Sequence, residues 1–148
     1  MSASPAPDYA GDLSVREAWN LLARDPKAQL IDVRTVAEWN FVGVPDLSSL
    51  ERPLHRIEWQ AYPSMQPNPH FVADAIQALG EAGADTGTPV VFLCRTGARS
   101  RAAAMAMTRA GYGKAFNITS GFEGAINPDG HRGAIDGWKV AGLPWRQT

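Results

Sequence analysis

The sequence contains a single cysteine, Cys94, among 148 residues. One thiol excludes an internal disulfide framework, so the chain gains no stability from an oxidising compartment. Histidine is also scarce: there are three, and none has a metal-ligand spacing with Cys94. We therefore expect no bound metal and no cofactor.

Neither sign of charge is in excess, with 14 Lys and Arg against 15 Asp and Glu and a formal net charge of −1. No basic excess exists to displace counterions, which argues against a nucleic-acid partner. Residues 1–12 have neither the basic start nor the apolar core of a secretory signal, and no apolar run reaches membrane-spanning length. We expect a cytoplasmic protein without a membrane partner, in a reducing compartment that keeps the thiol available.

What is present is an ordinary globular composition, with 45% hydrophobic and 20% charged residues. A chain of this length is most simply one domain with a sizeable core. The start of the chain is rich in Pro, Ala and Ser, which predicts a flexible tail over residues 1–11. Residues 12–148 then form the single domain.

Apolar periodicity predicts alternating helices and strands. Helices are expected after Ser14, whose spacing to Glu17 is that of a capping box, and over 69–82 and 98–109. Short apolar runs predict strands at 29–33, 54–59, 90–93 and 115–118, and helical turns are expected at 35–39, 121–125 and 134–141. This alternation predicts an α/β fold with a central parallel sheet of four or five strands and helices on both faces.

Three chemically distinctive residues fall at the carboxyl ends of predicted strands, where ligand sites of parallel sheets lie: Asp32, Arg34 and Cys94. Cys94 also opens a loop, Cys94-Arg95-Thr96-Gly97-Ala98-Arg99-Ser100, that leads into a helix. Loop N–H groups, the positive end of the helix and two arginines all favour a thiolate over a thiol. The alternative is a buried cysteine that acts as a small hydrophobic residue.

The same loop resembles the active-site loop of rhodanese-type sulfurtransferases. Residues 30–34 with Glu38 and Trp39 resemble the amino-terminal segment of that family, and residues 121–124 and 137–144 resemble its carboxy-terminal motif. The matches run in order from about residue 12 to 145. The resemblance implies a rhodanese-like fold and transfer of a sulfane sulfur through a persulfide on Cys94.

The resemblance also implies the roles of the neighbouring residues. Cys94 would be the nucleophile, and the loop residues would bind the donor: Arg95, Thr96, Gly97, Ala98, Arg99 and Ser100. Arg99 could equally hold the loop through Asp32 or Glu123, and Ser100 could cap the helix. Asp32 and Arg34 are expected as a supporting structural pair, although Arg34 with Glu38 has the spacing of a simple i,i+4 contact. The expected partners are a small anionic sulfur donor such as thiosulfate and a protein or small thiol as acceptor.

Two features depart from the family pattern. Residues 125–137 intervene between the glycine turn and the tryptophan, and this segment carries His131 and Arg132. It is either a lid that selects the acceptor or an ordinary surface insertion. The second departure is at 41–45, where the family often has glycine followed by histidine and this chain has no histidine.

Three other functions stay open. Cysteine phosphatases also place a cysteine and an arginine around an anion, but with five residues between them, whereas Cys94 and Arg99 have four. The smaller ring should fit a single sulfur atom better than a phosphate. Rhodanese-like domains also serve as non-catalytic interaction modules, which usually lack the cysteine. The third alternative is a protein-to-protein persulfide carrier, which the sequence does not separate from a free-standing enzyme.

Overall fold

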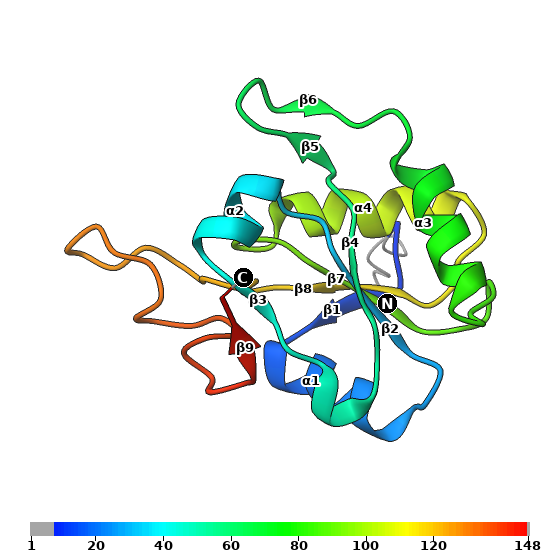
Figure 1. The fold of residues 1–148 in the computed structure, drawn as a ribbon, viewed down its shortest axis with the longest axis horizontal. Helices are drawn as coiled ribbons and strands as arrows, with labels where there is room; N and C mark the ends of the chain where they lie inside the picture. The colour runs from blue at the N-terminus through cyan, green and yellow to red at the C-terminus, as the bar shows by residue number, and fades with distance from the viewer. Residues whose placement is uncertain (1–7, 148) are drawn as a thin grey trace, which may run out of the picture.

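A computed structural model describes residues 8–147 of the chain. Its core is a five-stranded parallel sheet in the order β1-β8-β7-β2-β4 (Figure 1). The strands, in that order, are Gly11–Leu13, Ala115–Ile118, Val90–Leu93, Gln29–Asp32 and Leu54–Arg56. The central strand β7 is fully buried along its length, as a strand covered on both faces must be. The predicted α/β class with a parallel sheet of four or five strands is confirmed.

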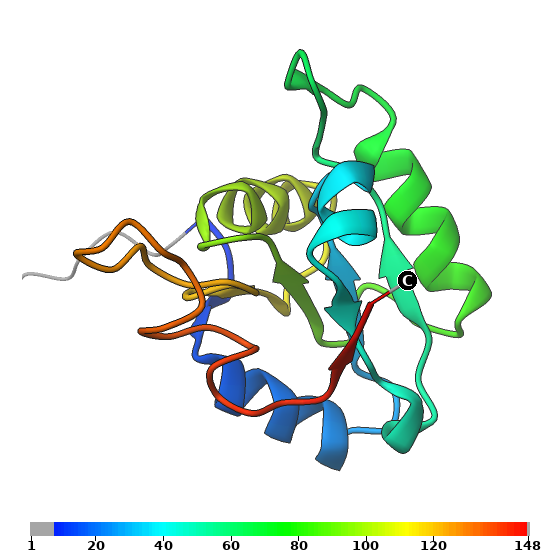
Figure 2. The ribbon, with the colours of Figure 1, turned by 60° about the vertical axis from the view of Figure 1, so that its left-hand side comes forward.

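Helices cover both faces of this sheet, also as predicted. α1 (Val15–Arg24) lies on one face, and α3 (Phe71–Glu81) and α4 (Ala98–Arg109) lie on the other (Figure 2). The apolar side chains divide accordingly into two clusters. Leu22 of α1 packs in one of them with Leu30 and Val91, and Leu79 of α3 packs in the other with Ile31 and Phe92. Alternate residues of β2 and β7 therefore face opposite layers of the core.

Two capping boxes fix the starts of helices. Ser14 accepts a hydrogen bond from the backbone N–H of Glu17, whose side chain accepts in return from the Ser14 N–H, and α1 begins there as predicted. Thr35 and Glu38 form the same reciprocal pair at the start of α2 (Val36–Phe41). The helical turn expected at 35–39 is therefore a short helix that extends to Phe41.

Two small two-stranded antiparallel sheets and a short 3₁₀ helix, η1 (Ser48–Leu50), lie outside the main sheet. β3 (Val44–Pro45) pairs with β9 (Trp145–Arg146), which holds the carboxyl end of the chain against the body. β5 (Gln60–Ala61) and β6 (Gln66–Pro67) form a hairpin that stands above α2 and α4 in Figure 1. The single strand predicted at 54–59 is shorter than expected: β4 ends at Arg56, although the Ile57 and Trp59 N–H groups still donate to the Asp32 and Val33 carbonyls at 3.0 and 3.1 Å.

Two predicted features differ in the structure. Neither of the helical turns predicted at 121–125 and 134–141 becomes a helix, because Gly121, Gly124 and Gly137 have positive φ angles that a right-handed helix does not accept. The second segment keeps one helical hydrogen bond, from the Ala141 N–H to the Gly137 carbonyl at 3.0 Å. The predicted tail also ends too late. Residues 1–7 lie outside the described part, but Tyr9 is buried in the core and Gly11 begins β1.

Within residues 8–147 no helix is both long enough and apolar enough to cross a membrane.

Candidate active site

Cys94 lies directly after β7, at the centre of the carboxyl edge of the sheet. Its side chain is buried, with 1% exposure. The neighbouring strand β2 ends beside it, because the Val33 N–H donates to the Leu93 carbonyl at 2.8 Å and Asp32 is in register with Leu93. The structure thus brings Asp32, Arg34 and Cys94 to one edge of the sheet.

Two polar groups contact the Cys94 sulfur in the part of the chain that the structure describes. The Gly97 N–H donates to Sγ at 3.0 Å, and the Ser100 hydroxyl oxygen lies 3.2 Å from Sγ. α4 begins at Ala98, so its amino-terminal end points its partial positive charge at the sulfur. The prediction that Ser100 caps this helix is wrong: Gly97 occupies the cap, and Ser100 faces the thiol from the first turn.

Glycine is required at two places around this loop. Gly97 has a φ of +114°, and a Cβ there would collide with the Thr119 carbonyl oxygen. Gly121 has a φ of +68°, and a Cβ there would collide with the Arg95 carbonyl oxygen. Both the backbone angle and the lack of space therefore exclude a side chain, and the close approach lets the Gly97 N–H reach the sulfur.

The turn at residues 121–124 is hydrogen-bonded to the backbone of the Cys94 loop. The Phe122 N–H donates to the Cys94 carbonyl at 2.8 Å. The Glu123 and Gly124 N–H groups donate to the Arg95 carbonyl at 3.1 and 3.2 Å. Sequence reasoning recognised this segment as a motif but missed its task, which is to satisfy the loop carbonyls with backbone donors so that the loop N–H groups can face the sulfur.

Asp32 and Arg34 form an ion pair with no exposure on either side chain. Arg34 Nη2 lies 2.6 Å from Asp32 Oδ2, and Arg34 Nε lies 2.9 Å from Asp32 Oδ1. Arg34 also donates to the Gly43 carbonyl at 2.8 Å, and its guanidinium stacks on the Phe122 ring at 4.3 Å. The i,i+4 contact between Arg34 and Glu38 does not form. The pair is enclosed by protein, in keeping with a supporting role.

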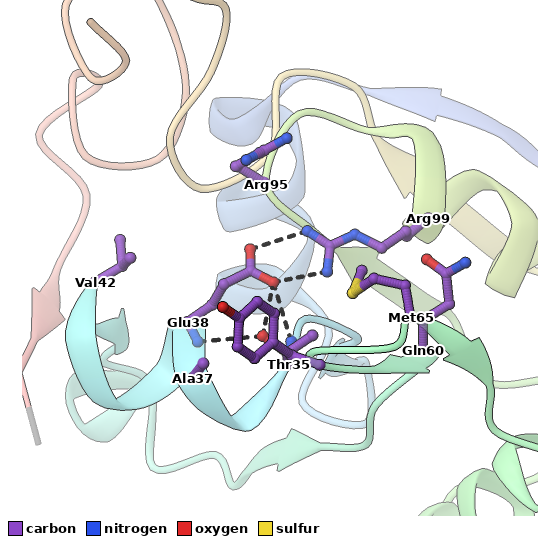
Figure 3. A pocket seen from close by; sticks show the side chains of 9 residues that line it. Thr35, Ala37, Glu38, Val42, Gln60, Met65, Arg95 and Arg99 are labelled. Carbon is purple, nitrogen blue, oxygen red and sulfur yellow. Dashed lines mark hydrogen bonds and ion pairs between the residues drawn. The ribbon is translucent and has the colours of Figure 1, made fainter.

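A cavity of about 520 Å³ opens beside the Cys94 loop (Figure 3). Its wall combines apolar groups with two cations from the loop, and it is lined by Thr35, Ala37, Glu38, Val42, Gln60, Tyr62, Met65, Arg95 and Arg99. Arg95 is exposed and forms no ion pair with any residue that the structure describes. Thr96 and Ala98 do not line the cavity. Of the predicted donor-binding residues, only Arg95 and Arg99 face it.

Arg99 is held by Glu38, a residue that sequence reasoning did not assign to the site. Arg99 Nη1 and Nη2 donate to the two Glu38 carboxylate oxygens at 2.7 and 2.9 Å, and Figure 3 shows Glu38 pointing from α2 toward the guanidinium. The predicted partners Asp32 and Glu123 are therefore wrong. Arg99 is neutralised in this arrangement, which leaves Arg95 as the unpaired cation of the cavity wall.

The ion pair makes stability depend on pH. Burial alone would raise the pKa of the Glu38 carboxyl, but the hydrogen bonds and charge of Arg99, with hydrogen bonds from Thr35, outweigh it and hold the pKa below its ordinary 4.5. A carboxyl with a lowered pKa in the folded state stabilises the protein above its unfolded pKa. That contribution is lost as the pH falls below 4.5 and through the folded value.

We expect Glu38→Gln to lower the free energy of unfolding by about 1–3 kcal/mol at pH 7, because charge-assisted hydrogen bonds are lost in a half-enclosed site. The difference from wild type should shrink as the pH falls below 4.5 and through the lowered pKa of Glu38 in the folded state, because the carboxylate is then protonated. Urea unfolding at pH 7, 5 and 3 measures this. Glu17→Gln is the matched control, since Glu17 has the same capping-box geometry and no arginine ion-pair partner within residues 8–147. A loss in Glu38→Gln that matched this control at every pH would contradict the role of Arg99.

The candidate lid extends away from the body of the protein (Figure 1). Its contacts are internal or to its own base: the Asn127 N–H donates to the His131 carbonyl at 2.7 Å, and Arg132 Nη1 donates to the Gly124 carbonyl at 3.0 Å. None of residues 125–137 lines the cavity beside the Cys94 loop, and Cys94 itself is not among the lining residues. The lid role of His131 and Arg132 stays a prediction that this arrangement does not favour.

In the part of the chain that the structure describes, no cluster of three or more His, Cys, Asp or Glu residues has the geometry to hold a metal ion. The groups gathered at this edge of the sheet include a thiol, its hydrogen-bond donors and the arginines of the loop.

Comparison with known proteins places this chain in a family. The chain is 35% identical over 130 residues to an uncharacterized protein, RP600, of Rickettsia prowazekii, covering 88% of this chain and 92% of that protein. The crystal structure of Rv0390 from M. tuberculosis matches with a TM-score of 0.84 and 46% identity, over 95% of this chain and 99% of that one.

A third match is the polysulfide-sulfur transferase homodimer from Wolinella succinogenes, with a TM-score of 0.58 and 24% identity over 95% of this chain and 80% of that one. At that identity the likeness shows the fold, and the rhodanese-like α/β fold that the motifs predicted is confirmed. The family model described as the STR4 middle domain matches residues 10–148. With the described domain matched almost from end to end, this chain belongs to the STR4 middle-domain family.

Proposed function

We propose that the protein is a sulfurtransferase that carries a sulfane sulfur as a persulfide on Cys94. The observation that carries the proposal is the setting of the thiol. Its buried sulfur accepts a hydrogen bond from Gly97 at the amino-terminal end of α4, and the loop that carries it contributes Arg95, which has no ion-pair partner among residues 8–147, to the wall of a cavity. A thiolate at a helix start with adjacent cations is the activated form that sulfur displacement requires.

The chemistry balances without a cofactor. The Cys94 thiolate attacks the outer sulfur of thiosulfate, the bond between that sulfur and the sulfonate breaks, and the electron pair leaves with sulfite. The product is a persulfide anion on Cys94, whose inner sulfur keeps the hydrogen bond from the Gly97 N–H while the charge lies on the outer sulfur. A thiolate or cyanide acceptor then attacks the terminal sulfur and regenerates the Cys94 thiolate.

The cavity supports an anionic donor larger than a bare sulfur atom. Arg95 supplies the cation, whereas Arg99 is committed to Glu38. The remaining wall includes Val42, Tyr62 and Met65, which suits the body of an organic persulfide as well as thiosulfate. We therefore propose thiosulfate and low-molecular-weight persulfides as donors, and a small or protein thiol as the acceptor.

The test is the intact mass of the purified protein before and after incubation with excess thiosulfate or glutathione persulfide. We expect a gain of one sulfur, about 32 Da, that cyanide removes. Because Cys94 is the only cysteine in the chain, a single measurement of intact mass assigns the added sulfur to Cys94. Protein alkylated beforehand is the control and should gain nothing.

Two outcomes discriminate among the alternatives. Sulfur taken up from the persulfide but not from thiosulfate would support a persulfide carrier. A thiol that alkylates readily but accepts sulfur from neither donor would contradict sulfur transfer and favour a non-catalytic interaction module.

A further inference from the structure

A chain of polar side chains runs from the surface of β1 to the Cys94 sulfur. Asp12 on β1 is in register with Asn117 on β8, and Asn117 Nδ2 donates to Asp12 Oδ1 at 3.1 Å. On its other side, Asn117 Oδ1 lies 2.6 Å from the Ser100 hydroxyl oxygen, which in turn lies 3.2 Å from Cys94 Sγ. Asn117 is 3% exposed and Ser100 is fully buried, whereas Asp12 is exposed.

The Asp12 carboxylate determines the direction of each hydrogen bond in this row of side chains. An ionised carboxylate only accepts hydrogen bonds, so the Asn117 amide must present its NH₂ group to Asp12 and its oxygen to Ser100. An amide oxygen also only accepts. The short contact of 2.6 Å therefore places the single Ser100 hydroxyl hydrogen on the side of Asn117. The Tyr9 hydroxyl also donates to the same Asp12 oxygen, at 2.8 Å.

A consequence follows for the sulfur, because one hydroxyl hydrogen cannot serve two acceptors. While Ser100 donates to Asn117, its lone pairs face Cys94 and can accept from the S–H of a thiol. A thiolate needs the opposite arrangement, with the hydroxyl turned toward Sγ and Asn117 Oδ1 left without its donor. Burial makes that orphaned oxygen unfavourable.

We infer that Asp12 and Asn117 are positioning residues that hold the Ser100 hydroxyl away from the sulfur and so oppose ionisation of Cys94. The proposal deepens the proposed function, on which its relevance to sulfur transfer rests. It also assigns Ser100 a switching role, since the hydroxyl faces either Asn117 or the anionic sulfur. The Gly97 N–H and the helix start act in the opposite direction and favour the anion.

Other charges near the thiol must be kept constant in any test. These charges are Asp32 at the end of β2, Arg34 two residues after it, Glu38 from α2, and Arg95 and Arg99 from the loop and α4. None of them takes part in the chain from Asp12 to Ser100. A substitution of Asp12 or Asn117 therefore changes the Ser100 hydrogen bond while these five charged groups stay in place.

The experiment is the rate of alkylation of the full chain by neutral iodoacetamide as a function of pH. Asn117→Leu removes the competing acceptor without a change of charge, and it should move the midpoint of the profile to lower pH. One hydrogen bond gained by the anion corresponds to an alkylation rate about tenfold higher at a pH below the midpoint. Asp12→Ala, at an exposed position, frees the Asn117 amide to rotate and should act in the same direction.

The Ser100→Ala background separates this mechanism from a simple charge effect. If Asp12 acts through the hydroxyl, Asp12→Ala should have no effect on the midpoint when Ser100 is alanine. Tyr9→Phe is the matched control, because it removes a hydrogen bond to the same carboxylate oxygen but keeps the charge, and it should leave the profile unchanged.

An unchanged or higher midpoint in Asn117→Leu would overturn the proposal. So would a shift by Asp12→Ala of equal size with serine and with alanine at position 100, because the effect would then act through space. If Asn117→Leu does not fold, the Asp12→Ala comparison in the two backgrounds decides alone. Alkylation requires no sulfur donor, so these outcomes are distinct from a failure of the proposed transferase activity.

Discussion

Replacing Cys94 with serine is expected to abolish sulfur transfer, with a loss of about a thousandfold or more in turnover with any donor. A hydroxyl in this position is not ionised near neutral pH and does not form a stable bond to a sulfane sulfur. The chain has no second cysteine that could take over the sulfur. The fold should persist, because serine has nearly the same shape and can keep the hydrogen bond from the Gly97 N–H.

The measurement is steady-state turnover with thiosulfate and with glutathione persulfide, together with urea unfolding of both proteins. We expect the free energy of unfolding to change by about 1 kcal/mol at most, since one hydrogen-bonded polar side chain replaces another. Activity that survives in a folded serine variant would show that the sulfur is not carried on residue 94. Loss of activity together with loss of folding would leave the mechanism to the intact-mass experiment.

Much of the fold is predictable because its main elements carry strong local signals. The capping box of Ser14 and Glu17 begins α1, and the apolar run before Cys94 is the buried central strand. The edge strand β1 is not predictable in this way. Its three residues form a strand only because β8 offers them a partner, and that contact depends on the tertiary fold rather than on local pattern.

The site residues likewise divide into those that local sequence predicts and those that depend on tertiary contacts. The position of Cys94 and the need for glycine at 97 follow from the loop sequence and from the place of ligand sites in parallel sheets. The partner of Arg99 does not follow, because Glu38 lies 61 residues away and approaches only when α2 packs beside the loop. Asn117 did leave a signal: it is an amide within a short apolar strand, and such a buried group must have a hydrogen-bond partner.

The buried pair of Asp32 and Arg34 should have the largest effect on stability. We expect Arg34→Met to lower the free energy of unfolding by about 3–5 kcal/mol, because it leaves the Asp32 carboxylate enclosed without a counter-charge. Urea unfolding measures this change. Arg95→Met is the matched control: it removes an exposed arginine of the same edge that has no ion-pair partner in residues 8–147, and it should change stability by about 0.5 kcal/mol or less.

Removing both charges should be less harmful than removing one. Arg34 Nη1 is buried without a hydrogen-bond partner among the described residues. The hydrogen bonds and attraction of the ion pair therefore do not fully offset the free-energy cost of removing both charges from water. An Asp32→Leu and Arg34→Met double variant should therefore be more stable than Arg34→Met alone, since no enclosed charge remains. A double variant as unstable as the sum of its single variants would contradict this account. The pair would then support the site through shape and through the Arg34 contacts with Gly43 and Phe122.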